Sequence, residues 1–523
     1  MKKFIVVLAV FILHNLTASC QEILKASSFK HYIDKFNAKD TEHAPGFIPN
    51  TEAWDFLSAN IPLLDVPDED IQRTYYFRWW TYRKHIKKTP EGYVITEFLP
   101  DVPWAGKYNT ISCPASLHFY EGRWLHNQDY LNDYATFWFK RGGNPRLYSF
   151  WAADAIYNFY LVSHDKTSIS QLFPELQANY MAWEKDHLDA NGLFWQTDDR
   201  DGMEVSICGS GYRPTINSYL FGDALAISKM ATLLGKPAIA TAYAQKAATI
   251  KQLMQTTLWD ALAGFFKVKP RAPAGGLCDA KELLGYTPWY FNLPDETYSK
   301  AWRYLNDTAY FKAPFGPTSA ERNHPGFKIS YQGHECQWNG PSWPYATSIT
   351  LTAMANLLNN YQQDIIKKAN YYELLKTYSA SQQLKTDMGD AVPWIDENLN
   401  PFTGDWISRT RLKTWENGTW SIGKGGVERG KDYNHSTYCD LVISGLIGIR
   451  PDKGDHLVIN PLVPDEKWDY FCLDNVLYHG KNITILYDRS GKRYKKGKGL
   501  IVFVNGHKKA ASKVIKKLVV KIT

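Results

Sequence analysis

The chain has 523 residues, of which 44% are hydrophobic and 22% are charged, and these values exclude a disordered or fibrous protein. Its length predicts one large domain with a smaller one beside it. The net charge is +7, but the C-terminal lysines alternate with Val, Ile and Leu, which predicts a solvated strand face and no nucleic-acid partner.

The first 20 residues have the order of an export signal. Lys2 and Lys3 precede the apolar run FIVVLAVFIL, which is too short to span a bilayer, and small residues then lead to Cys20. We expect a signal peptide over 1–19 and a lipidated Cys20 as the mature N-terminus, resembling a bacterial lipobox. This predicts an exported lipoprotein of the periplasm or outer membrane, whose only membrane contact is this anchor. Ordinary cleavage near Ser19 or Cys20 is the alternative.

Residues 20–60 carry few periodic signals and predict an N-terminal tether or strap. From Ile71 onward, apolar residues recur at three- and four-residue steps, which predicts a helix over 71–86. Similar patterns predict helices over 127–140, 148–163, 167–187, 215–234, 237–257, 341–359, 363–384 and 436–447.

Long loops rich in Gly, Pro, Asn and aromatic residues separate these helices, at 195–213, 287–294, 315–343 and 393–431. Loops of this length are uncommon in compact domains unless they build a site. Residues 61–450 therefore predict a mainly α fold, an (α/α) barrel with a cleft at its mouth.

The pattern changes after about residue 450. Short β-branched runs occur at 456–460, 483–487, 500–504 and 514–522, and Asn505-Gly506 is a strong hairpin signal. Residues 451–523 therefore predict a small antiparallel β domain.

The cysteines do not indicate a metal centre. Six remain besides Cys20, and none forms a C-x-x-C pair. An exported chain permits disulfides, although the spacing does not say which form. No cluster has metal-ligand spacing and no phosphate-binding loop is present, so we expect no metal and no cofactor.

The loop around Glu204 is the first candidate for chemistry. Four acids lie between Asp198 and Glu204, among aromatic residues and a glycine. Cleaving a glycosidic bond requires a proton donor at the leaving oxygen, and crowding keeps one carboxyl of such a group protonated. Asp201 or Asp199 is the alternative donor, and a structural acidic turn is the alternative interpretation.

The loop around Glu397 is the second candidate. The turn signals Asn400-Pro401 and Thr403-Gly404 hold Glu397 on a tight loop between Trp394 and Trp406. An ionised carboxylate there could deprotonate a water on the opposite face of a sugar. A solvated acidic loop is the alternative.

The order of these motifs resembles the inverting glycosidases of family 63, the trehalases and the mannosylglycerate hydrolases. The segment DGME at 201–204 occupies the place of their S-G-[ML]-D acid motif, and ENLNPFTG at 397–404 matches their E-x-x-N-P-x-T-G base motif. QWNGPSW at 337–343 corresponds to Y-W-R-G-P-x-W, with Asn339 in place of Arg. The segment 433–437 also looks like these families, and we expect it near the cleft.

The resemblance implies an (α/α)6 barrel and an exo-acting, inverting hydrolase of an oligosaccharide, with Glu204 as general acid and Glu397 as general base. An α-linked hexoside is the expected substrate, while an α-L-rhamnoside or a furanoside stays open. Glu in place of Asp at the acid and Asn339 in place of Arg suggest a different sugar or linkage.

Further substrate contacts are expected from aromatic platforms and polar groups, although each could equally pack in the core. The candidates are Trp195, Trp289, Trp338, Trp343 and Trp406 as platforms, and Asp201, Arg213, His334, Asn339, Arg409 and His435 as hydrogen-bonding groups. Two other classes remain open, a glycan-binding lipoprotein on a degenerate barrel and a polysaccharide lyase.

Overall fold

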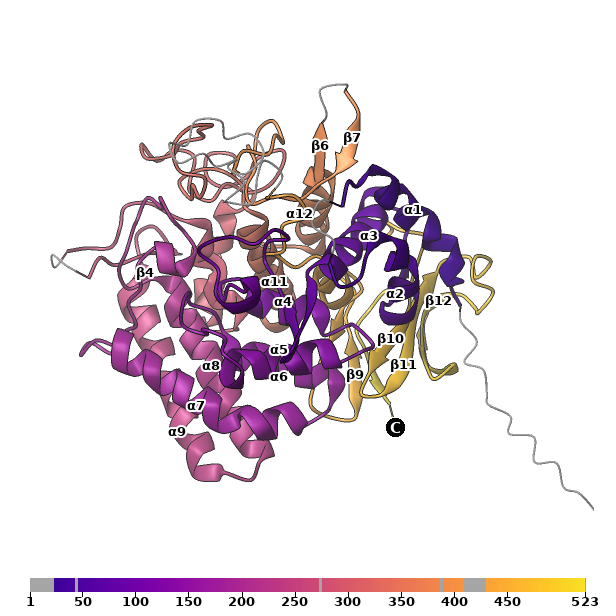
Figure 1. Cartoon of the computed structure of the whole chain (residues 1–523), viewed down its shortest axis with the longest axis horizontal. Coiled ribbons are helices and arrows are strands. Elements are labelled where there is room, and N and C mark those ends of the chain that lie inside the picture. Colours follow the sequence, from indigo (N-terminus) through magenta and orange to yellow (C-terminus); the bar gives the residue numbers. More distant parts are fainter. Residues whose placement is uncertain (1–22, 43–45, 272–274, 386–388, 409–428, 523) are drawn as a thin grey trace, which may run out of the picture.

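The computed structural model describes residues 23–42, 46–271, 275–385, 389–408 and 429–522. This part of the chain is mainly helical, with small antiparallel sheets (Figure 1). The predicted signal peptide, Cys20 and Arg409 lie outside the described residues. Within them, no helix combines the length and apolar character that crossing a membrane requires.

The N-terminal segment, predicted as a tether or strap, contains short helices and one strand. Its elements are the 3-10 helices Ala26–Phe29 and Asn50–Glu52, the helices α1 (Lys30–Lys39) and α2 (Ala53–Asn60), and the strand β1 (Leu63–Asp65). Tyr32, Ile33 and Phe36 of α1 are buried, and the Tyr32 ring stacks on Tyr76 with 5.3 Å between centroids. Helices this short contain too few apolar positions to show a period.

The remaining helices follow in chain order. They are α3 (Glu69–Lys84), α4 (Ala115–Gly122), α5 (Asp129–Lys140), α6 (Ala152–Ser163), α7 (Thr167–His187), α8 (Pro214–Leu233), α9 (Pro237–Leu253), α10 (Thr287–Tyr290), α11 (Pro344–Asn360) and α12 (Lys368–Ser381). Shorter helical turns cover Lys107–Asn109, Asp199–Asp201, Met254–Leu258, Leu283–Tyr286, Glu296–Tyr304 and Leu441–Leu446.

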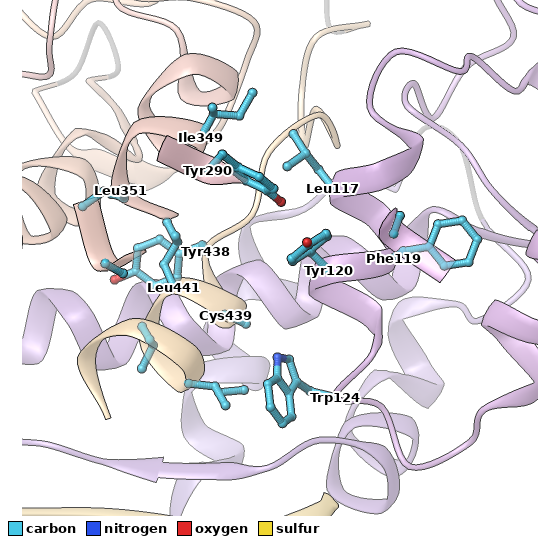
Figure 2. Close-up of a cluster of buried hydrophobic side chains, with 14 of the residues drawn as sticks. Leu117, Phe119, Tyr120, Trp124, Tyr290, Ile349, Leu351, Tyr438, Cys439 and Leu441 are labelled. Carbon is cyan, nitrogen blue, oxygen red and sulfur yellow. The ribbon is translucent and has the colours of Figure 1, made fainter. Parts of the chain in front are cut away.

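Eight of the predicted helices are confirmed within a few residues, and the ninth, at 436–447, is a short π-helical turn. The helix α4 had no signal because all of its residues are buried, so it presents no polar face to set a period. Its Tyr120 faces Tyr290 of α10, with 5.4 Å between ring centroids (Figure 2). This contact belongs to the packed interior where segments distant in sequence meet.

Within the described residues, three two-stranded ribbons lie among the helices. They pair β2 (Ile86–Thr89) with β3 (Gly92–Ile95), β4 (Trp259–Asp260) with β5 (Phe265–Phe266), and β6 (Gln383–Lys385) with β7 (Ala391–Pro393).

The C-terminal region forms two antiparallel sheets. Its strands are β8 (Ile449–Arg450), β9 (His456–Ile459), β10 (Tyr470–Tyr478), β11 (Lys481–Asp488), β12 (Gly499–Val504), β13 (His507–Ser512) and β14 (Leu518–Lys521). The larger sheet has the order β1-β10-β11-β12-β13 and the smaller one β14-β9-β8. The N-terminal strand β1 is thus an edge of the C-terminal sheet, and Figure 1 shows α1 and α2 beside it.

The predicted hairpin at Asn505-Gly506 is confirmed. Val504 of β12 pairs with His507 of β13, and the two turn residues have positive φ values of 49° and 78°. Both angles fit the tight turn that joins two antiparallel strands, and Asn and Gly tolerate them best.

Candidate active site

A pocket of about 230 Å³ opens where the long loops meet. Its walls come from parts of the chain that are distant in sequence. The polar and aromatic residues lining it are Glu97, Glu204, Glu335, Glu397, His334, His435, Cys113, Cys336, Phe98, Trp104, Trp338, Trp343, Tyr148, Tyr345 and Tyr433. Both carboxylates predicted for catalysis therefore face one cavity.

Glu204 reaches the pocket through a turn at Gly202. Gly202 has a φ of +74° and ends the turn Asp199–Asp201, and a Cβ placed on it would lie 2.6 Å from Cys113 Sγ. Only glycine suits both the positive φ and this close approach. Past the turn, Met203 is buried and Glu204 is half-buried, with its carbonyl accepting from Trp338 N at 3.2 Å.

Cys113 lies near two of the pocket carboxylates. Burial of the thiol, and then the charges of Glu97 and Glu204, raise the pKa of Cys113 well above its usual value. A nucleophilic cysteine requires a thiolate, which a lowered pKa would provide. The site therefore offers carboxylates and a protonated thiol, and no activated sulfur at Cys113.

Glu397 is buried, and both of its carboxyl oxygens have hydroxyl neighbours. Ser408 Oγ donates to Oε2 at 2.5 Å, and the Tyr433 hydroxyl lies 3.0 Å from Oε1. The backbone N–H of Glu397 donates to Asp396 Oδ1 at 2.6 Å, which fixes the loop locally. A buried carboxylate requires such partners to stay ionised.

Glu335 is neutralised by a buried cation. Arg429 donates to Glu335 Oε1 at 2.7 Å, and both side chains are almost completely enclosed. The Glu335 carbonyl accepts from Asn398 Nδ2 at 3.0 Å, and Ser408 Oγ lies 2.9 Å from it. Glu335 therefore ties the loop around Glu397 to the segment before Trp338.

Two tryptophans form one wall of the pocket. The rings of Trp338 and Trp343 stack with 4.1 Å between centroids, and Trp343 Nε1 donates to Gln337 O at 2.8 Å. The His435 ring lies beside the Tyr433 ring, with 4.1 Å between centroids. His334 also lines the pocket, and its side chain is exposed. These four candidates for substrate contact are thus brought together with Glu204 and Glu397.

Asp201 and Arg213 pair with each other and do not line the pocket. Arg213 Nε donates to Asp201 Oδ2 at 3.0 Å, Ser149 Oγ donates to Oδ1 at 2.6 Å, and Thr215 also donates to this carboxylate. Both side chains are about 1% exposed or less. The prediction of sugar contact is wrong for this pair, because their polar atoms face one another inside the protein.

Asp199, the other alternative acid, is exposed and also lies outside the pocket lining.

Two predicted platforms are core residues. Trp289 is completely buried against Trp302 and Phe266. Trp406 is equally buried, and its Nε1 donates to Gln383 O at 2.8 Å. The prediction of sugar stacking is wrong for both, because neither ring has an open face.

Trp195 and Asn339 also lie outside the pocket lining. The Trp195 ring is half-buried and carries the Arg271 guanidinium 4.2 Å above its centroid. Asn339 is half-buried, and its backbone carbonyl accepts a hydrogen bond from Lys328 N at 3.0 Å. Neither side chain lines the pocket in which we expect the sugar, so the structure gives no support to the predicted contacts.

Several residues that line the pocket had no signal in the sequence, among them Glu97, Tyr148 and Glu335. Glu97 follows the strand β3 in a segment without a period or motif, and only the Pro- and Trp-rich run at 100–104 marks a structured loop. Tyr433 lies in the segment 433–437 that we expected near the cleft, and it does line the pocket.

A disulfide joins Cys208 to Cys278. It connects the loop that follows Glu204 to the segment after β5. Across the described residues, no group of three or more His, Cys, Asp or Glu side chains is arranged to hold a metal ion.

Comparison with known proteins identifies two domains. Residues 107–436 match the family model of the mannosylglycerate hydrolase MGH1-like glycoside hydrolase domain. Residues 449–510 match the C-terminal domain of glycosyl hydrolase family 65.

Among solved structures, a chain named sialidase is 41% identical, with a TM-score of 0.88, over 95% of this chain and 45% of that one. The family 63 mannosylglycerate hydrolase of Thermus thermophilus, solved with glucose, is 12% identical with a TM-score of 0.50, covering 71% of this chain and 99% of its own. The latter similarity concerns the fold alone.

A curated, uncharacterized protein of Borreliella burgdorferi is 25% identical over 182 residues, which are 34% of this chain and 38% of that protein. The chain thus spans less than half of this relative and of the sialidase chain. The family model nevertheless covers more than half of this chain. The chain therefore belongs to the MGH1-like glycoside hydrolases, and its residues 107–436 are an O-glycosyl hydrolase domain.

Proposed function

We propose that the protein is an exo-acting glycoside hydrolase that inverts the anomeric carbon, with Glu204 as general acid and Glu397 as general base. The observation that carries this proposal is that both carboxylates, from two loops almost 200 residues apart in sequence, line one pocket. We also infer that the helices of residues 61–450 form an (α/α)6 barrel, with this pocket at its mouth.

The proposed reaction requires one group that donates a proton and one group that accepts a proton. Glu204 protonates the glycosidic oxygen as its bond to the anomeric carbon breaks. Glu397 takes a proton from a water that attacks the same carbon from the opposite face, so one proton leaves Glu204 and one arrives at Glu397. Exchange with solvent restores both groups.

The substrate is proposed to be the terminal sugar of an α-linked oligosaccharide. A confined pocket with a Trp338–Trp343 wall suits one ring. An α-linked hexoside is our first candidate, and an α-L-rhamnoside or a furanoside follows.

The test is turnover of a panel of 4-nitrophenyl glycosides and oligosaccharides, with NMR detection of the first anomer released. Glu204→Gln and Glu397→Gln should each lower kcat by about 10²- to 10⁴-fold while thermal unfolding stays unchanged. Asp199→Asn, an exposed neighbour outside the pocket, is the matched control and should keep full activity. Full activity in both glutamine variants would disprove the assignment.

The same panel separates the alternatives. A glycan-binding protein would show saturable binding without product. A polysaccharide lyase would release unsaturated products that absorb ultraviolet light.

We further propose export as a lipoprotein anchored at Cys20. Cys20→Ser should move the protein from the membrane fraction to the soluble periplasmic fraction. An unchanged membrane fraction would contradict the anchor.

A further inference from the structure

A second cavity, of about 180 Å³, lies among the helices and shares no lining residue with the candidate active site. On α11, Tyr345 lines the first pocket and Asn356 lines the second. About three turns of helix separate these two residues, or about 16 Å along the helix axis. The second cavity is therefore a separate site, farther along the same helices.

This cavity is lined by the later parts of several helices and by the start of the C-terminal sheet. Tyr120 and Tyr290, which face each other in Figure 2, form part of its wall. Lys229 and Asn292 also line it and are exposed, so the cavity reaches the surface on their side. Its charged lining residues are Arg123 directly after α4, Asp154 in α6, Lys229 in α8, Asp440, and Arg450 in β8.

Arg123 and Asp440 neutralise each other. Nη2 and Nε of Arg123 donate to Asp440 Oδ1 at 2.7 and 3.1 Å. Trp124 Nε1 and Ser444 Oγ donate to the same oxygen at 2.7 and 2.8 Å. Neither side chain of the ion pair is more than 4% exposed. This pair therefore adds no net charge to the cavity.

Asp154 is a weaker acid than an exposed aspartate. The Tyr120 hydroxyl donates to Asp154 Oδ2 at 2.6 Å. Burial raises the pKa of the Asp154 carboxyl, although Tyr120, Lys229 and Arg123 oppose this effect. The neighbouring Asp223 does not line the cavity, and its carboxylate accepts from Asp154 N at 3.0 Å.

Arg450 has a neutral partner. Among the described residues, the one hydrogen bond of its guanidinium goes to Asn356 Oδ1 at 2.5 Å. Asn356 Nδ2 donates to the backbone carbonyls of Tyr290 at 2.7 Å and Trp289 at 3.2 Å, which directs the amide oxygen towards Arg450. Nε and Nη1 of Arg450 make no hydrogen bond within the described part of the chain.

The cavity has an excess of positive charge. Its described lining contains three cations and two carboxylates, so it is positive even with both carboxylates ionised. Burial lowers the pKa of Arg450 and the charge of Arg123 lowers it further, while Asp440 acts in the opposite direction. A bound anion would offset both the burial of the guanidinium and its repulsion from Arg123.

We propose that this cavity binds a small oxyanion, a phosphate or a carboxylate, on the guanidinium of Arg450 with Lys229 at its mouth. A guanidinium presents parallel N–H groups that match two oxygens of such an anion. Because Arg450 belongs to β8 and contacts Asn356 of α11, the anion would join the C-terminal sheet to the helices. This site does not depend on the proposed catalytic function.

Equilibrium dialysis of the full-length protein against radiolabelled inorganic phosphate tests the site without a substrate. Sodium chloride keeps the ionic strength constant, and we expect one phosphate bound per chain at millimolar concentrations. Displacement by acetate would show that carboxylates share the site, and a lack of displacement would restrict it to phosphate. Either result supports an oxyanion site, whereas no bound phosphate and no bound acetate would mean a water-filled cavity and overturn the inference.

Variants locate the binding. Arg450→Gln should weaken phosphate binding about 10- to 100-fold, because it removes a charge-assisted hydrogen-bond donor. Lys229→Gln, an exposed change, should weaken it about 2- to 5-fold. Asp154→Asn should bind at least as tightly as wild type, because it removes a carboxylate from the wall. Arg489→Gln is the matched control, an exposed arginine directly after β11, and should bind as wild type does.

Thermal unfolding checks that each variant is folded before dialysis. Should Arg450→Gln fail to fold, Arg450→Lys keeps the charge without the paired donors and should also weaken binding. Wild-type affinity in the Arg450 variant, or loss of binding in Asp154→Asn, would overturn the inference. Labelled glucose that bound wild type but not Arg450→Gln, with no phosphate bound, would indicate a sugar site and overturn it as well.

Discussion

Asp201 lies three residues before Glu204, and its carboxylate is enclosed with Arg213, Thr215 and Ser149. Replacing it with Ala leaves the Arg213 guanidinium as a buried charge without its carboxylate. We expect Asp201→Ala to lower the free energy of unfolding by about 3–5 kcal/mol, measured by urea denaturation.

The matched change in the same loop is Asp199→Ala, whose side chain is exposed, and it should stay within about 0.5 kcal/mol of wild type. Should Asp201→Ala keep wild-type stability but lose turnover, Asp201 would belong to the chemistry and not to the support of the loop.

The sequence predicts a pocket residue where a motif fixes both the type of that residue and its position in a loop. Glu204, Glu397, Trp338 and Trp343 lie in such motifs, and all line the pocket. Trp289 lies in a segment that the sequence predicted as an aromatic loop, yet it belongs to α10 and is in the core. A pattern of residue types does not say which ring face is covered, because that depends on segments distant in sequence.

Glu97 is a pocket residue that the sequence could not predict. It reaches the site because the backbone carbonyls of Thr96 and Glu97 accept hydrogen bonds from Asn434, more than 300 residues away. No local pattern encodes this contact. The contact between Glu97 and Tyr433 therefore depends on tertiary structure, whereas the proposed general acid and base lie in sequence motifs.

At the scale of elements, the disulfide between Cys208 and Cys278 closes a loop with a sequence separation of 70 residues. Closing a loop of this size restricts the unfolded chain, and the usual contribution is about 2–4 kcal/mol. The double variant Cys208→Ser/Cys278→Ser should therefore have a lower free energy of unfolding by about this amount, measured by urea denaturation.

Dithiothreitol provides the control for this prediction. It should lower the stability of wild type to that of the double variant and leave the variant unchanged. Equal stability of wild type with and without reductant would mean that the bond does not form or does not constrain the unfolded chain.

Elements with a long periodic or apolar run were predictable, including the fully buried strand β12, and short elements without such a run were not. The long amphipathic helices α7 and α9 follow their sequence period. The helix α4 is buried on every side, and α1 and α2 are too short for a period to show. The strand β13 has mostly exposed residues and was found only through the turn before it.

At the scale of the whole molecule, the two ends of the described chain stabilise each other. The strand β1 pairs with β10, and the backbone N–H groups of Ile23 and Leu24 both donate to Asp474 Oδ2 at 2.8 Å. Sequence order alone suggested a tether at one end and a separate β domain at the other. Long-range pairing joins them, so we regard the N-terminal segment as part of the folded unit.

The N-terminal helices are also linked to the site through a buried ion-pair network. Lys84 Nζ lies 2.8 Å from Asp40 and 2.6 Å from Asp432, the residue before Tyr433. Lys431 Nζ lies 2.9 Å from the other oxygen of Asp40. This network connects the end of α1, the end of α3 and the segment that carries Tyr433.

Acid should weaken this network in a predictable direction. Burial alone would raise the pKa of Asp40, but Lys84, Lys431 and Asn50 outweigh it and hold this pKa well below its usual value. A carboxylate with a lowered folded-state pKa stabilises the protein above its unfolded pKa, about 3.9, and this stabilisation is lost as the pH falls further. The free energy of unfolding of wild type should therefore decrease at pH values below about 4, as measured by urea denaturation across the acid range.

The variant Asp40→Asn should be less stable than wild type at neutral pH, and its stability should decrease less steeply in acid. The variant Asp34→Asn, an exposed change in α1, should follow wild type. Equal slopes for wild type and Asp40→Asn would mean that the network does not couple protonation of Asp40 to folding.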